Sequence, residues 1–134
     1  KIKKKLISMG IVKGPLYISQ KEYLSLFKSL LIKQLKNKKF LPCLLAGWDN
    51  TPRYKTKGFL IDSKISTLLK KQFDILHDCI LKEKRIDLIF IKAWNEWAEG
   101  NILEPYSTLR EEDNPGLVIK DYKKVLIDKY NINA

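Results

Sequence analysis

The feature that most constrains the fold is an alternation between amphipathic helices and short, mainly apolar runs, the second of which contains Asp87. The apolar runs cover 40–46 and 86–91, and helical spacing of apolar residues predicts helices over 20–37 and 64–84, with a last helix over 118–130. Apolar runs of this length without polar alternation are typical of strands buried on both faces of a parallel sheet. The order helix, strand, helix, strand, helix therefore predicts an α/β fold with parallel strands and right-handed crossovers.

Two local signals mark the boundaries of these elements. Ser19 followed by Glu22 matches a capping box, in which each side chain bonds a free backbone N–H at a helix start. Pro42 has no N–H to donate, so we expect it near the start of its strand or at a bulge.

Two strands alone make a poor sheet, since each leaves an unpaired edge and an uncovered face. The chain also begins at Lys1 rather than at Met. We therefore expect residues 1–134 to be a single partial domain, a fragment or processed product whose other strands lie before Lys1.

The net charge of +11 is concentrated in residues 1–57, which hold 14 Lys and Arg against two acidic residues. A basic half is compatible with an anionic partner. However, only three of the 26 cations are Arg, the residue that usually reads bases and clamps phosphates. We favour a solvated lysine surface and no nucleic-acid partner. No run approaches the ~20 apolar residues of a membrane span, so no transmembrane segment is expected.

The two cysteines, Cys43 and Cys79, form no CxxC pair and have no histidine at ligand spacing. We expect buried, reduced thiols, which fit a reducing compartment and a cytoplasmic location. The single histidine, His77, lies beside an apolar stripe and is expected to be structural. No residue cluster has metal-ligand spacing, so neither a metal nor another cofactor is expected.

The loops after the two predicted strands, 47–54 and 94–105, contain all three tryptophans, Trp48, Trp94 and Trp97. Functional loops of parallel α/β folds leave the C-terminal ends of the strands. Indole faces cover the apolar face of a sugar, while carboxylates and amides bond its hydroxyls. The loops therefore favour a saccharide site, although a tryptophan can also simply plug the mouth of a barrel.

Glu96 and Glu99 are the candidate catalytic pair, because glycosyl chemistry typically needs two carboxyl groups in different protonation states. If the strand ends in a helical turn, residues three apart lie on one side, roughly 5–6 Å apart at Cβ. In an extended chain they would point to opposite faces. The spacing alone is also common on solvated helices, so the flanking tryptophans carry the argument.

The two loops, read as Pro-Cys-x-x-x-Gly-Trp-Asp-Asn-Thr and Ala-Trp-Asn-Glu-Trp-Ala-Glu-Gly-Asn-x-Leu-Glu-Pro, resemble the closing segment of the WbsX-type glycosyltransferase family. That family is associated with bacterial lipopolysaccharide and other surface polysaccharides. It is similar in turn to endo-α-mannosidase-type glycoside hydrolases, which share an Asn-Glu-Trp-x-Glu-Gly motif on a (β/α)8 barrel. The resemblance implies that the chain forms the last two βα units of a (β/α)8 TIM-type barrel.

The resemblance also implies roles for single residues. In the similar hydrolases the glutamate at Glu96 acts as a base on the 2-hydroxyl of the substrate, through an anhydro-sugar intermediate. The glutamate at Glu99 is the acid/base at the glycosidic oxygen. A charged insertion over 109–114 departs from the family pattern. The expected substrate-binding residues are Trp48, Asp49, Asn50, Arg53, Trp94, Asn95, Trp97 and Glu104, the last of which is also suited to bracing the loop.

The function expected of the full-length protein is glycosidic bond formation in lipopolysaccharide or surface-polysaccharide assembly. Its partners would be an oligosaccharide or polysaccharide and, as a candidate donor, a nucleotide sugar. One alternative is an endo-acting, α-mannosidase-like hydrolase using the same glutamates. The other is a non-catalytic barrel remnant or sugar-binding fragment, which suits the isolated chain because a quarter of a barrel cannot enclose a substrate.

Overall fold

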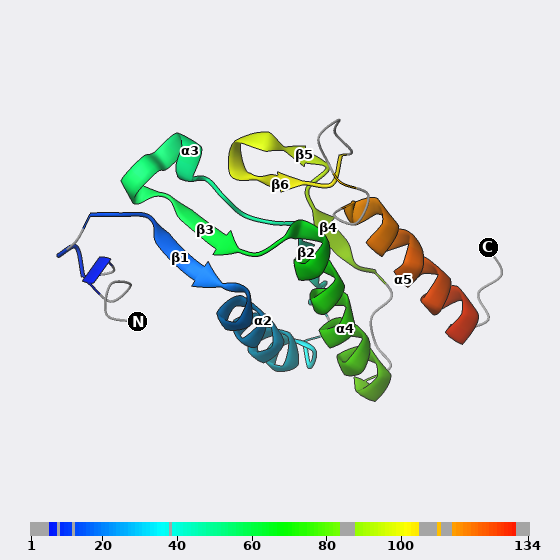
Figure 1. Cartoon of the computed structure of the whole chain (residues 1–134). Helices are drawn as coiled ribbons and strands as arrows, with labels where there is room; N and C mark the ends of the chain where they lie inside the picture. The colour runs from blue at the N-terminus through cyan, green and yellow to red at the C-terminus, as the bar shows by residue number, and fades with distance from the viewer. Residues whose placement is uncertain are drawn as a thin grey trace.

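The computed structural model describes residues 6–7, 9–11, 13–37, 39–83, 88–104, 110 and 114–130. In Figure 1 the long helices extend toward one end of the molecule, while α3 and the β5–β6 hairpin lie at the other. The elements, in chain order, are β1 (Leu16–Ser19), α2 (Gln20–Gln34), β2 (Cys43–Leu45), α3 (Thr51–Tyr54), η1 (Lys55–Lys57), β3 (Phe59–Asp62), α4 (Ile65–Glu83), β4 (Phe90–Lys92), β5 (Asn95–Glu96), η2 (Trp97–Glu99), β6 (Asn101–Ile102) and α5 (Pro115–Tyr130).

The three long helices confirm the helical predictions. The predicted capping box is present, with Ser19 Oγ accepting from Glu22 N at 3.3 Å and Ser19 N donating to Glu22 Oε2 at 3.1 Å. Helix α2 ends at Gln34, a few residues before the predicted boundary, and α4 and α5 lie close to the predicted ranges. The periodicity of the apolar residues was therefore sufficient to locate all three.

The two predicted strands are present but shorter. β2 begins just after Pro42, whose carbonyl accepts from Phe90 N at 2.9 Å, so the proline lies at the strand start as expected. β4 begins at Phe90 rather than at residue 86, and residues 84–87 lie outside the described part. β2 and β4 pair in parallel, with Leu44 opposite Ile91. The mixed α/β class and the parallel pairing are confirmed.

Two further strands, β1 and β3, were not predicted from the sequence. They pair in parallel, with Leu16 opposite Phe59 and Ser19 opposite Asp62. Each has four residues, and each is followed within a few residues by a long helix. Segments this short give little periodicity, so the sequence analysis assigned no element to them.

The β2–β4 sheet is covered on one face only within the described residues. Leu44 is fully buried against the helices and Ile91 packs against the same core, whereas Phe90 is 50% exposed and Cys43 is exposed. The expectation that both strands are buried on both faces, and that Cys43 is buried, is therefore wrong here. Successive side chains point to opposite faces of a strand, and the helices cover just one of them. Cys79 is buried, as expected.

The outer edge of β2 is closed by the side chain of Gln72 on α4, which is fully buried. Its Oε1 accepts from Leu45 N at 3.0 Å and from the Tyr23 hydroxyl at 3.0 Å. Its Nε2 donates to Leu45 O at 2.8 Å and to Leu68 O at 3.2 Å. These four bonds use every donor and acceptor position of an amide side chain. A side chain thus satisfies the last backbone groups of an edge strand.

Candidate functional site

The two predicted loops lie beyond the C-terminal ends of β2 and β4. We call residues 46–50 the first loop and residues 93–104 the second loop. The strands remain joined up to this point, since Ala46 N donates to Lys92 O at 2.8 Å. The second loop then forms the β5–β6 hairpin, with η2 at its tip, and Glu104 N closes it by donating to Trp94 O at 2.8 Å.

The loops contact each other through Gly47, Asp49, Glu99 and Gly100, which we call the loop junction. Asp49 N donates to Glu99 O at 2.7 Å. A Cβ on Gly47 would lie 2.9 Å from the carbonyl oxygen of Gly100, so only glycine allows this approach. Gly100 itself has a φ of +56°, in the left-handed region that glycine adopts without strain. The two loops therefore form one continuous surface.

Gly47→Ala is expected to lower the free energy of unfolding by about 1–3 kcal/mol, because the new methyl group would overlap a backbone oxygen that cannot rotate away. The measurement is urea denaturation followed by circular dichroism. Gly14→Ala is the matched control, since its Cβ would meet its nearest neighbour, Ile7 Cδ1, at an ordinary 3.5 Å. Equal stability of the two variants would contradict the close approach at Gly47.

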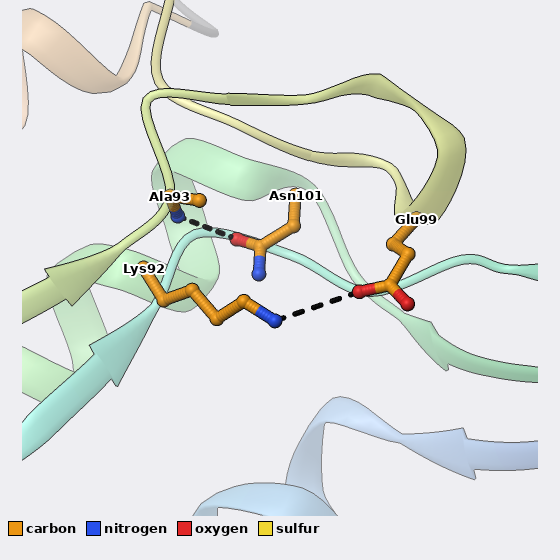
Figure 2. Close-up of polar contacts among 4 residues, drawn as sticks. All are labelled: Lys92, Ala93, Glu99 and Asn101. Carbon is orange, nitrogen blue, oxygen red and sulfur yellow. Dashed lines mark hydrogen bonds and ion pairs between the residues drawn. The ribbon is translucent and has the colours of Figure 1, made fainter.

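Asn101 holds the base of the hairpin. It is fully buried, and its Oδ1 accepts from Ala93 N at 3.0 Å (Figure 2). Within the described residues its Nδ2 is buried without a hydrogen-bond partner. Sequence reasoning did not single out Asn101. The signal available was its position directly after the positive-φ glycine, Gly100, where the chain turns back toward the strand.

The two candidate glutamates have different surroundings. β5 is followed by the helical turn η2, which contains Glu99, whereas Glu96 is the last residue of the strand. Glu96 is exposed, whereas the side chain of Glu99 is 23% exposed and pairs with Lys92 Nζ at 3.5 Å. Lys92 was not predicted as a site residue, because no short sequence motif indicates a contact between the end of a strand and the following loop. That the glutamates act as a pair stays a prediction.

The three tryptophans divide into two kinds. Trp94 and Trp97 are 61% and 52% exposed. Trp97 Nε1 donates to Glu104 Oε2 at 3.1 Å, so Glu104 braces an indole of the same loop. Trp48 is half-buried, with Lys92 Nζ 4.8 Å from its ring centroid and its own Nε1 buried without a partner among the described residues. The exposed indoles have the surface that a sugar ring could cover.

The polar side chains of the first loop accept hydrogen bonds from residues that follow the loop. Asp49 Oδ1 accepts from Thr51 N at 2.9 Å and from Thr51 Oγ1 at 2.6 Å. Asn50 Oδ1 accepts from Phe59 N at 2.6 Å, which ties the loop to β3. Both side chains therefore shape the loop, and their predicted contact with sugar is untested. The two other predicted contacts are exposed: Arg53, which lies 5.4 Å from the Tyr54 ring centroid, and Asn95 in β5.

A cavity of about 380 Å³ opens beside the loop junction, where β3 meets α4. Trp48 and Asp49 line it together with Asp62, Ser63 and Gly100. Glu96 and Glu99 do not line this cavity, although Glu99 precedes Gly100 in the chain. Asp62 and Ser63 are additional polar groups near the loops, and sequence reasoning missed them because it missed β3.

The described part of the chain contains no group of three or more His, Cys, Asp or Glu side chains that could hold a metal ion. Searched over the same residues, no helix is long and apolar enough to cross a membrane.

The structure is thus a mixed α/β chain with acidic and indole side chains in the loops after β2 and β4. The chain belongs to the Glycosyltransferase WbsX family, whose model matches residues 2–112. Two relatives from Xanthomonas campestris pv. campestris, strains B100 and ATCC 33913, are both named "Uncharacterized protein WxcX". Each is 33% identical over 82 residues, covering 58% of this chain and 11% of the relative. No solved structure matches significantly.

Proposed function

We propose that the protein carrying this sequence transfers a sugar onto an oligosaccharide or polysaccharide in the assembly of a bacterial surface polysaccharide, lipopolysaccharide included. The family supports a carbohydrate role, since its name describes a glycosyltransferase. The finer parts of the proposal are a nucleotide sugar as donor and a cytoplasmic location, where such donors are made.

The observation that carries the proposal is the loop junction. It fixes the backbone of Glu99 to the first loop, since Asp49 N donates to Glu99 O at 2.7 Å. The second loop also carries Glu96 and the two exposed indoles of Trp94 and Trp97. Acid and base catalysis of glycosyl transfer requires a carboxyl group held in a fixed position, and exposed indoles offer a surface for the sugar ring.

In this proposal the two glutamates divide the proton chemistry. Glu96 takes the proton of a hydroxyl on the donor sugar while the bond from that sugar to its nucleotide breaks and the nucleotide leaves. Glu99 then takes the proton of the acceptor hydroxyl as its oxygen bonds to the sugar, and Glu96 returns its proton to the sugar hydroxyl. The two carboxyl groups have different surroundings: Glu96 is exposed, whereas Glu99 is partly buried and pairs with Lys92.

We further propose that the chain forms the C-terminal part of a (β/α)8 barrel. The open face of the β2–β4 sheet, with Phe90 50% exposed, supports this, because additional strands would cover it. The relatives are long enough to supply them, since the matched segment is 11% of their length. Gln72 bonds the backbone of Leu45. A strand added at this edge of β2 would therefore pair with the residues that precede Leu45.

The test is product analysis with the complete protein that carries this sequence. A fluorescent oligosaccharide acceptor is incubated with and without a panel of nucleotide sugars, and products are separated and weighed by mass spectrometry. Transfer predicts a product longer by one sugar that appears only with a donor. Shorter products without a donor would instead establish the endo-acting hydrolase. Saccharide binding without either product would establish a sugar-binding protein.

A further inference from the structure

Lys92 connects the strand end to both loops. It is the last residue of β4, opposite Leu45 of β2, so its backbone is fixed by the sheet. Its Nζ lies 3.5 Å from Glu99 Oε2 and 4.8 Å from the ring centroid of Trp48. Figure 2 shows the Lys92 side chain extending from the strand toward Glu99 on the second loop.

The contact with Trp48 gives this ion pair a fixed geometry. An exposed ion pair between two long side chains is weak, since both side chains lose rotamer freedom when they pair. Here the ammonium group also lies over an indole, the ring with the strongest attraction for cations. Trp48 is itself held in place, because Ile61 N donates to its carbonyl at 2.8 Å and joins it to β3. Lys92 is thus restrained by a second contact in addition to the ion pair with Glu99.

The same contact limits what Trp48 can do. The ammonium group of Lys92 covers one face of the Trp48 ring, and the Nε1 atom of that ring is buried. Trp94 and Trp97 are more exposed, at 61% and 52%. Trp48 therefore suits the support of Lys92 better than it suits the stacking of a sugar ring.

We propose that Lys92 is a positioning residue, held over Trp48 so that its ammonium group fixes the orientation of the Glu99 carboxylate toward the reacting sugar. The inference rests on the proposed function, since it assigns a role in that chemistry. Lys92 acts through Glu99 and does not itself contact substrate. Misplacement of a catalytic group by about 1 Å costs on the order of a hundredfold in rate, so a loss of this support is measurable.

The test measures kcat and KM of Lys92→Met and Lys92→Arg in the complete protein, in the wild-type background and in a Glu99→Gln background. In the wild-type background, Lys92→Met is expected to lower kcat by about ten- to a hundredfold and to leave KM within about twofold. Lys92→Arg keeps the charge and the contact with the indole, and should restore most of the rate. In the Glu99→Gln background, Lys92→Met should cause no further loss, because its target carboxylate is absent.

Lys21→Met, on the exposed side of α2, is the control for removing a lysine charge. An equal loss from Lys92→Met in both backgrounds would overturn the positioning role, since a residue needed only for folding reduces both rates. A rise in KM without a fall in kcat would assign Lys92 to substrate binding and also overturn it. A wild-type rate for Glu99→Gln itself would overturn the proposed function and this inference together, whereas a wild-type rate for Lys92→Met alone would overturn only the inference.

Discussion

Glu99→Gln and Glu96→Gln are each expected to lower kcat of the complete protein by about 10²–10⁴-fold while leaving the fold intact. Glutamine has nearly the same shape as glutamate but cannot exchange the proton that glycosyl transfer moves. At Glu99 the change also removes the charge that pairs with Lys92 at 3.5 Å. The measurement is initial rate at saturating donor and acceptor, with circular dichroism spectra to establish that each variant is folded.

Asp121→Asn is the control for removing an acidic charge, since Asp121 is exposed on α5. It should retain the wild-type rate. Saccharide binding by both glutamate variants should also persist and can be followed through tryptophan fluorescence, because Trp94 and Trp97 are exposed on the same loop. A wild-type rate in either glutamate variant would exclude the role proposed for that residue.

Gln72→Leu is expected to lower the free energy of unfolding by about 2–4 kcal/mol. Leucine would leave Leu45 N, Leu45 O and the Tyr23 hydroxyl without the partner that Gln72 supplies. Each buried polar group left unbonded costs about 1–3 kcal/mol. Tyr23 cannot relieve the loss by ionising: burial, with a smaller contribution from the charge of Cys43, raises the pKa of its hydroxyl to about 12. Urea denaturation followed by circular dichroism measures the change.

The matched control is Gln34→Leu, the same chemical change on α2. Gln34 is half-buried, and no side-chain hydrogen bond of Gln34 is present within the described residues. Its replacement should change the stability by less than about 0.5 kcal/mol. A Gln72→Leu variant as stable as this control would show that closure of the β2 edge contributes little to folding.

The helices were the most predictable part of the fold. Ser19 and Glu22, which form the capping box, are three positions apart. Such a signal is local and can be recognised in the sequence. The strands were less predictable. β1 and β3 form by pairing with each other, and Leu16 and Phe59 are more than 40 positions apart in the chain. No local sequence pattern indicates such a pairing.

The candidate site shows the same division. The motif residues could be selected because indoles and carboxyl groups gathered at two predicted strand ends. The residues that support them could not, since Lys92 reaches Glu99 and Trp48 through tertiary contacts alone. The burial of Asn101 could likewise not be predicted from the sequence, because an asparagine after a glycine usually indicates an exposed turn.

The contact between the two loops constrains how members of this family can be recombined. Gly47 and Gly100 approach each other closely enough to exclude a methyl group, and Asp49 bonds to Glu99, so each loop is shaped to fit the other. A chimera that exchanges one loop alone would bring together two surfaces that never evolved in contact. Transplanting the proposed saccharide site between relatives therefore calls for moving residues 46–50 and 93–104 as a single unit.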